Sequence, residues 1–154
     1  MRTPASIAGH PIHPMLVTIP IGLWIFSLVC DLVHVFGAAD PVWSTVAVFT
    51  MAGGVVGALL AAIPGLIDLL SLPERPRKTA LMHMTINLII VALYLVNLWL
   101  RLADTSPRPA QGMDFPVWLS LLAVAMLAVS GWLGGHMVYV EQVAVSGAND
   151  HPKA

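Results

Sequence analysis

Four long apolar runs, separated by short polar stretches, constrain the fold of this chain more than any other feature. They cover residues 15–36, 43–70, 80–100 and 115–139. A helix needs about 20 apolar residues to cross the hydrocarbon core of a bilayer, and backbone groups inside lipid must be satisfied within the spanning structure. The pattern therefore predicts an all-α fold, an integral membrane four-helix bundle. We expect the bundle to form one domain over residues 1–154, with a polar tail at 141–154.

The composition favours a membrane location and argues against a nucleic-acid partner. Hydrophobic residues make up 58% of the chain and charged residues 10%, whereas soluble domains carry roughly 25% charged residues. The formal net charge is -1, with 7 basic and 8 acidic residues, so the basic face that nucleic acid requires is missing. The single cysteine, Cys30, lies inside the first apolar run, where a buried and inert thiol is expected.

Basic residues in the connections predict the orientation of the bundle, because cytoplasmic loops carry the excess of Lys and Arg. One side of the predicted bundle holds five of them: Arg2, Arg75, Arg77, Lys78 and Lys153. The other side holds Arg101 and Arg108. We therefore predict an N-in/C-in topology, with both termini on the inner side. Two glycine pairs, Gly53 with Gly57 and Gly131 with Gly135, predict close helix packing in lipid.

Polar residues in the third run form one face of a helix. Steps of 4, 3, 4, 3 and 4 residues connect His83, Asn87, Ile90, Tyr94, Asn97 and Arg101. A face of this kind is costly against lipid, so we expect the polar seam of Asn87, Tyr94 and Asn97 to face the bundle interior. The first run has a matching face on which Asp31 reaches the level of Arg101. A buried charge requires a partner, and we therefore predict a structural ion pair between Asp31 and Arg101.

Histidines gather at the predicted inner ends of the helices. His10 and His13 precede the first run, His83 opens the third and His136 closes the fourth, while Asp68 closes the second. Imidazole is the commonest metal ligand among side chains. A haem b could take two axial ligands from His13, His83 and His136, with His10 near by. The basic residues between the second and third runs could then meet its propionates.

Two alternatives to haem remain open. His13, Asp68, His83 and His136 could hold a non-haem metal or another ion, because a mixed nitrogen and oxygen donor set suits several divalent metals. The histidines could instead bond only to backbone and water, in a structural or assembly subunit without a cofactor. Haem or redox activity, an ion site and a structural role are therefore the competing functions.

Four segments resemble a known family. They are GHPIHPMLVTIPIGLW at 9–24, AAIPGLIDLL at 61–70, the helix with His83 and Asn87, and SGWLGGHMVYVEQVAV at 130–145. Over about residues 9–145 the chain resembles domain of unknown function 2231, an uncharacterised bacterial membrane family. The resemblance implies a multi-pass protein of the bacterial inner (cytoplasmic) membrane with no established activity. Some members of the family resemble fusions to Rieske-type iron–sulfur domains. The resemblance therefore implies a redox setting and a Rieske-type partner.

One position departs from the family pattern. Glu141 stands where the closing motif of the family often has a histidine, so a ligand role cannot be carried over to it, and His136 bears more of that expectation. Nothing in the sequence indicates an enzyme acting on its own, since the chain has no nucleophile-elbow motif and neither an HExxH motif nor a phosphate-binding loop. Transport by a chain of this length without a clear inverted repeat would require a homo-oligomer.

Overall fold

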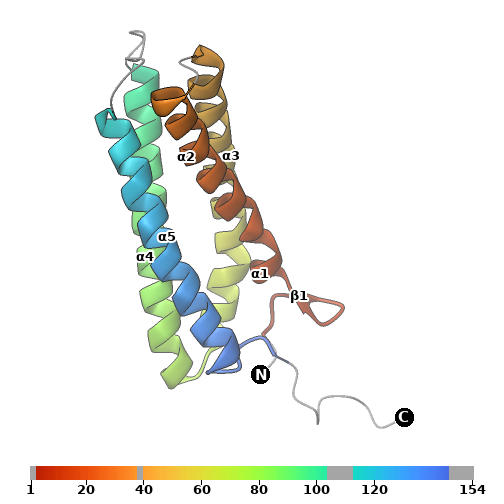
Figure 1. Ribbon diagram of the computed structural model, residues 1–154. Helices are drawn as coiled ribbons and strands as arrows, with labels where there is room; N and C mark the ends of the chain where they lie inside the picture. The colour runs from red at the N-terminus through yellow and green to blue at the C-terminus, as the bar shows by residue number, and fades with distance from the viewer. Residues whose placement is uncertain (1–2, 38–39, 104–112, 146–154) are drawn as a thin grey trace.

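A computed structural model describes residues 3–37, 40–103 and 113–145, and it places five helices and one small β-hairpin in a single elongated bundle (Figure 1). The elements in chain order are β1 (Ser6–Ile7), β2 (His10–Pro11), α1 (Ile12–Leu16), α2 (Thr18–Phe36), α3 (Pro41–Ser71), α4 (Glu74–Ala103) and α5 (Phe115–Tyr139). Strands β1 and β2 pair antiparallel. Their two-residue turn has positive φ at Ala8 and Gly9, as tight hairpins require.

Four helical segments are long and apolar enough to cross a membrane. They are Ile12–Phe36, which joins α1 to α2, then Pro41–Ser71, Glu74–Ala103 and Phe115–Tyr139. The predicted all-α membrane bundle is therefore confirmed, and each predicted apolar run lies inside one of these segments. The N-in/C-in orientation stays a prediction, and Arg2, Arg108 and Lys153, on which it partly depends, lie outside the described residues. The predicted polar tail is described only as far as residue 145.

The helix ends follow local sequence signals. Asp40 precedes Pro41 at the start of α3, and its side chain accepts a hydrogen bond from the backbone of Val42 at 2.9 Å. Asp114 caps α5 in the same way, accepting from the backbone of Val117 at 3.1 Å. A side-chain oxygen at this position satisfies an N–H group that has no partner within the helix. Helices α3 and α5 therefore both begin with a capping aspartate followed by a proline in the first turn.

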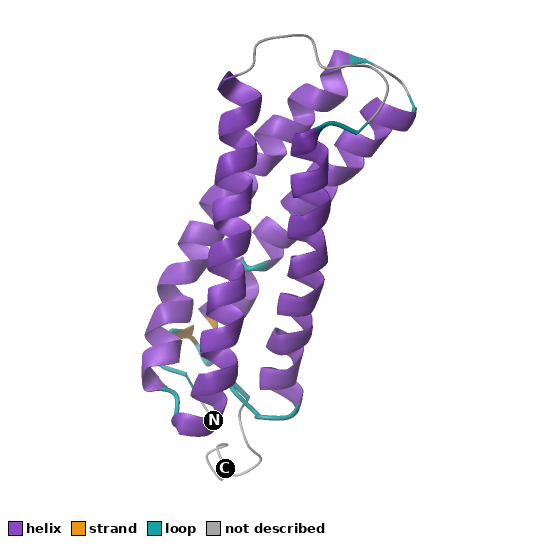
Figure 2. Ribbon diagram, turned by 90° about the vertical axis from the view of Figure 1, so that its left-hand side faces the viewer, coloured by secondary structure: helices purple, strands orange, loops and turns teal. Residues whose placement is uncertain are grey.

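The helices run alternately along the bundle. In Figure 1, α1, α2 and α4 rise while α3 and α5 descend, so the start of α1 and the end of α5 lie at the same end. We call this the lower end, and the opposite one the upper end. Figure 2 shows the same elongated bundle turned by 90°. Helix α2 packs mainly along α3, and α4 along α5, while α3 with α4 and α2 with α5 complete the ring. Helices α2 and α4 therefore face each other diagonally across the bundle axis.

An aromatic stack fills the middle of the bundle. Trp24 on α2 and Tyr94 on α4 lie parallel, with ring centroids 4.4 Å apart and an interplanar angle of 13°. The Trp24 indole N–H donates to the carbonyl of Met51 on α3 at 3.3 Å. A Cβ at Gly54 would lie 2.3 Å from the Trp24 Nε1 atom, so glycine is required where the indole crosses α3. Both rings are fully buried.

The two glycine pairs behave differently. A Cβ at Gly57 would lie 2.9 Å from Ile19, and one at Gly53 would lie 3.2 Å from Leu23, so this pair packs against α2 as predicted. A Cβ at Gly131 or Gly135 would meet nothing within 4 Å among the described residues. The prediction of close packing at the second pair is therefore wrong within the described chain, because that face of α5 points away from its neighbours.

Candidate functional site

His13 reaches from α1 to the backbone of α3. Its Nδ1 lies 2.8 Å from the carbonyl oxygen of Ala61. A carbonyl can only accept, so Nδ1 carries the proton and donates it. Gly65, one turn beyond Ala61, makes the approach feasible, because a Cβ there would lie 2.7 Å from Nδ1 of His13. The half-buried ring is therefore fixed against α3.

His83 on α4 is held by α5 in the same manner. Its Nδ1 donates to the carbonyl of Ser130 at 3.0 Å, and the Ser130 hydroxyl lies 3.1 Å away. Asn87, one turn along α4, donates to that hydroxyl at 2.7 Å and to the carbonyl of His83 at 2.8 Å. Gly134 stands one turn beyond Ser130, with space for a Cβ 3.6 Å from the ring of His83.

The two imidazoles meet across the diagonal of the bundle. Their ring centroids lie 6.4 Å apart, and the planes are perpendicular at 89°. Since Nδ1 and Nε2 lie on different sides of an imidazole ring, each Nε2 points away from the carbonyl that anchors its ring. In the neutral tautomer that these hydrogen bonds select, Nδ1 carries the proton and Nε2 holds a lone pair. The arrangement brings two imidazole rings close to one another, each held through Nδ1.

The other residues predicted for the inner cluster do not join this pair. His10 is exposed in the β-hairpin, where its Nδ1 donates to the carbonyl of Ala8 at 3.1 Å. Asp68 is buried, and its Oδ1 accepts the backbone N–H of Ala5 at 2.8 Å. His136 lies against Trp132, with ring centroids 6.3 Å apart.

The four-residue metal set is therefore not assembled. In the part of the chain that the structure describes, no three His, Cys, Asp or Glu side chains gather where they could hold a metal ion. Asp68 has a different role, because it fastens the N-terminal segment to the lower end of α3. Helix ends at the same depth do not place their side chains on the same side of the bundle, and this is why Asp68 and His136 face other neighbours.

Asp31 and Arg101 form a bidentate ion pair near the upper end. Nη1 of Arg101 lies 2.8 Å from Oδ1 of Asp31, and Nη2 lies 2.6 Å from Oδ2. The side chain of Arg101 is 1% exposed and that of Asp31 is 0% exposed. The structure therefore brings together the two charges that the sequence paired. Two parallel hydrogen bonds make this the stronger form of a carboxylate–guanidinium contact.

A hydrogen-bond network surrounds the ion pair. Asn97 accepts from Nε of Arg101 at 2.7 Å, and its amide donates to the carbonyl of Pro116 at 2.8 Å and the hydroxyl of Ser120 at 2.9 Å. On the other side, the Ser27 hydroxyl donates to the carbonyl of Ala47 at 2.8 Å. All four spans thus contribute to one buried polar layer. Such groups are costly in hydrocarbon unless they are paired.

Tyr94 completes the polar seam but differs from its neighbours. Its ring is fully buried, and its hydroxyl finds no hydrogen-bond partner among the described residues. The ring contributes through stacking on Trp24. Sequence periodicity placed Tyr94 on the interior face, but it gave no sign of the stack, which depends on the height of α4 relative to α2.

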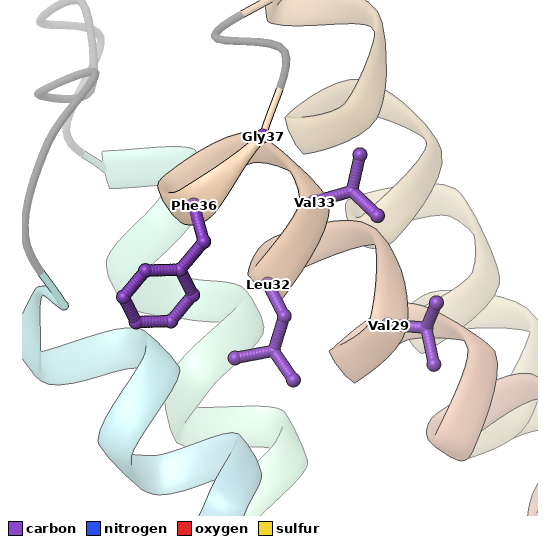
Figure 3. A pocket seen from close by; sticks show the side chains of 5 residues that line it. All are labelled: Val29, Leu32, Val33, Phe36 and Gly37. Atoms are coloured by element: carbon purple, nitrogen blue, oxygen red, sulfur yellow. The ribbon is translucent and has the colours of Figure 1, made fainter.

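A surface depression lies at the upper end of the bundle, away from His13 and His83. It is lined by Val29, Leu32, Val33, Phe36 and Gly37 at the upper end of α2, and the drawn side chains are all hydrocarbon (Figure 3). Phe36 is 73% exposed there. A depression of this composition on a membrane helix is suited to lipid chains and offers no polar group for a specific ligand.

Sequence reasoning missed the backbone anchors of the two histidines. Ala61 and Ser130 contribute through their carbonyl groups, which no side-chain pattern reveals. A usable signal was present, because each histidine points at a helix segment with glycine four residues beyond the accepting carbonyl: Gly65 after Ala61, and Gly134 after Ser130.

Comparison with known proteins places the chain in a family. The family described as "Predicted membrane protein (DUF2231)" matches residues 9–147. Neither the curated proteins nor the solved structures gave a match. Because the match covers nearly the whole chain, the protein belongs to this family of membrane proteins.

Proposed function

Taking membership of this membrane family as the premise, we propose that the protein is a redox module in which His13 and His83 bind one haem b. The observation that carries the proposal is the approach of these two imidazoles from α1 and α4, each with Nδ1 committed to a backbone carbonyl. The setting we propose is the bacterial cytoplasmic membrane.

The number of ligands favours haem over a bare metal ion. Haem iron already takes four nitrogens from its porphyrin, so His13 and His83 could supply the remaining ligands from the protein. A non-haem ion would need further protein ligands. Neither Asp68 nor His136, the further donors considered from the sequence, lies beside the pair. Two ligands on separate helices are also how bundles commonly hold cofactors.

The donor chemistry of the pair fits an axial ligand role. A metal-binding histidine usually donates its second ring N–H to a carbonyl or carboxylate, which fixes the tautomer and the ring orientation. His13 and His83 both meet this condition. The ring centroids lie 6.4 Å apart, so the two imidazoles could approach one iron ion from opposite sides.

The chain's own residues would hold and orient the group rather than perform chemistry on a substrate. Haem supplies a one-electron carrier when bound. Arg75, Arg77 and Lys78 are exposed at the start of α4, which lies at the lower end, and their charges would attract the propionates. A redox protein of the Rieske type is the partner that the family resemblance suggests for electron exchange.

The experiment is a haem titration of the purified protein in mild detergent. Absorption spectra are recorded as hemin is added to the wild type and to His13→Ala, His83→Ala, His10→Ala and His136→Ala. Elution as a single symmetric peak in size exclusion verifies that each apoprotein is folded. The last two substitutions are matched controls, because they remove histidines that the structure places away from the pair.

The proposal expects one haem per chain, with a low-spin spectrum in the wild type and in both controls. His13→Ala and His83→Ala should each abolish that spectrum while the apoprotein stays folded. A wild type that acquires no Soret band contradicts the proposal. Metal bound without haem would indicate the ion site instead, and stability losses without any ligand would indicate a purely structural role.

A further inference from the structure

Three contacts across the bundle axis join residues that are 70 positions apart in the chain. The first is the imidazole pair at the lower end, the second the aromatic stack in the middle, and the third the ion pair near the upper end. The residues are His13 with His83, Trp24 with Tyr94, and Asp31 with Arg101. One constant offset along the whole length of the bundle indicates that α1–α2 and α4 are equivalent elements in the same register.

The backbone contacts of these elements repeat with almost the same offset. His13 and His83 donate to carbonyls that are 69 positions apart, those of Ala61 and Ser130. Ser27 and Asn97, again 70 apart, donate to carbonyls 69 apart, those of Ala47 and Pro116. Glycines stand at equivalent positions beyond the accepting carbonyls, at Gly65 and Gly134. Helices α3 and α5 are therefore equivalent as well.

We infer that the bundle is a fused pair of equivalent hairpins meeting about a pseudo-two-fold axis, and that Asp31 and Arg101 make the first hairpin selective for the second over another copy of itself. Both hairpins run in the same sense, so the axis lies along the bundle, as in membrane proteins built from parallel repeats. In a two-fold interface, residues on the axis meet their own equivalents. The inference does not depend on whether haem binds.

The charges explain the selectivity. Pairing two first hairpins would bring Asp31 against a second aspartate, and pairing two second hairpins would bring Arg101 against a second arginine. Like charges in a buried site of low dielectric repel strongly, and each would also lack the bidentate partner it has here. At the lower end, identical histidines meet without this penalty, because neutral imidazoles tolerate each other.

Full-length variants can reproduce each unfavourable pairing. Arg101→Asp places two aspartates on the axis, and Asp31→Arg places two arginines there. The four polar side chains that α2 and α4 contribute to the layer are exchanged by combining Ser27→Asn, Asp31→Arg, Asn97→Ser and Arg101→Asp, which we call the complete exchange. An incomplete exchange changes only positions 31 and 101. Phe36→Arg, which adds a charge at an exposed site on α2, controls for the addition of arginine near the upper end.

Two measurements in mild detergent compare these variants. Size exclusion gives the folded fraction, and an unfolding titration gives the midpoint. Each single substitution at 31 or 101 should lower the folded-to-unfolded ratio at least about tenfold, since it breaks a buried ion pair, whereas Phe36→Arg should not. The complete exchange should recover most of the loss and exceed the incomplete exchange. A complete exchange no better than the incomplete one, or than the single variants, overturns the inference.

A second exchange tests the equivalence away from the charges. Trp24→Tyr combined with Tyr94→Trp and Ala123→Gly swaps the stacked rings between the hairpins. The third change supplies on α5 the glycine that Gly54 provides for the indole on α3. The combined variant should have a higher unfolding midpoint than Tyr94→Trp with Ala123→Gly, which places two tryptophans on the axis. A combined variant no more stable than that control would show that the two positions are not equivalent.

Discussion

Replacing Gly65 by alanine should displace the His13 ring from its position against α3. A Cβ at position 65 would lie 2.7 Å from Nδ1 and 2.9 Å from Cε1 of His13, so the ring must move away from the Ala61 carbonyl. Loss of the 2.8 Å hydrogen bond costs about 1 kcal/mol, and forced repacking costs about 1–3 kcal/mol. The better helix propensity of alanine offsets up to about 1 kcal/mol. We expect a net destabilisation of about 1–4 kcal/mol.

Gly134→Ala is the matched comparison, because Gly134 holds the equivalent position beside His83. Its added Cβ would lie 3.6 Å from Cε1 of His83, which is an ordinary van der Waals contact. Only the helix-propensity gain remains, so this variant should be neutral or more stable by up to about 1 kcal/mol. The same substitution should therefore lower stability at position 65 and should not lower it at position 134.

Reversible unfolding in mixed micelles of a mild and a denaturing detergent measures both free energies. Haem affinity of the same two variants provides a second readout, with Gly65→Ala weakened and Gly134→Ala close to wild type. The reasoning is refuted if Gly65→Ala is as stable as Gly134→Ala, because the short distances around His13 would then carry no energetic consequence.

Three further predictions concern other contacts. Asp31→Ala leaves a buried arginine without its ion-pair partner and should destabilise the protein by about 3–5 kcal/mol. Asp31→Leu combined with Arg101→Met should recover most of that loss in the same unfolding assay. Equal losses in the single and double variants would contradict this prediction. Gly54→Ala should push the Trp24 indole off α3 and shift its fluorescence emission, and an unchanged spectrum would argue against that packing. Asp68→Ala removes the acceptor that holds the N-terminal segment, so proteolysis near residue 5 should accelerate, and an unchanged cleavage rate would show that the contact is dispensable.

Hydropathy and periodicity predicted the bundle well because they report on the lipid environment directly. The four spans follow from runs of apolar residues, and the ion pair followed from placing Asp31 and Arg101 on interior faces at one height. A buried charge in a membrane has few alternatives to its partner. Strong physical penalties therefore made these features readable from the sequence alone.

The predicted inner cluster contained more residues than the structure brings together. Depth along the bundle can be read from helix ends, but the direction of a side chain around the helix depends on packing. His136 lies against Trp132, and Asp68 accepts from the backbone of Ala5, although both lie near the lower end. Among the histidines that the structure describes, His13 and His83 are the pair whose rings meet. Near the interface, polar side chains have several partners available, so the sequence does not select one.

The repeat was hidden because the two hairpins differ in most side chains. Aspartate faces arginine and tryptophan faces tyrosine at equivalent positions, so a search for identical residues finds little. The offset becomes evident only when the contacts across the axis are compared, together with backbone acceptors such as Ala61 and Ser130. Because the two hairpins belong to one chain, equivalent positions can carry complementary residues instead of identical ones.

The electron paramagnetic resonance spectrum of the oxidised protein loaded with one equivalent of haem tests the paired-histidine site most directly. The imidazole planes of His13 and His83 are perpendicular, at 89°. If both rings ligate the iron in these orientations, the spectrum should show a strongly anisotropic low-spin ferric signal, and it should disappear in His83→Ala. A high-spin signal, or a low-spin signal that persists when His83 is replaced, would contradict ligation by this pair.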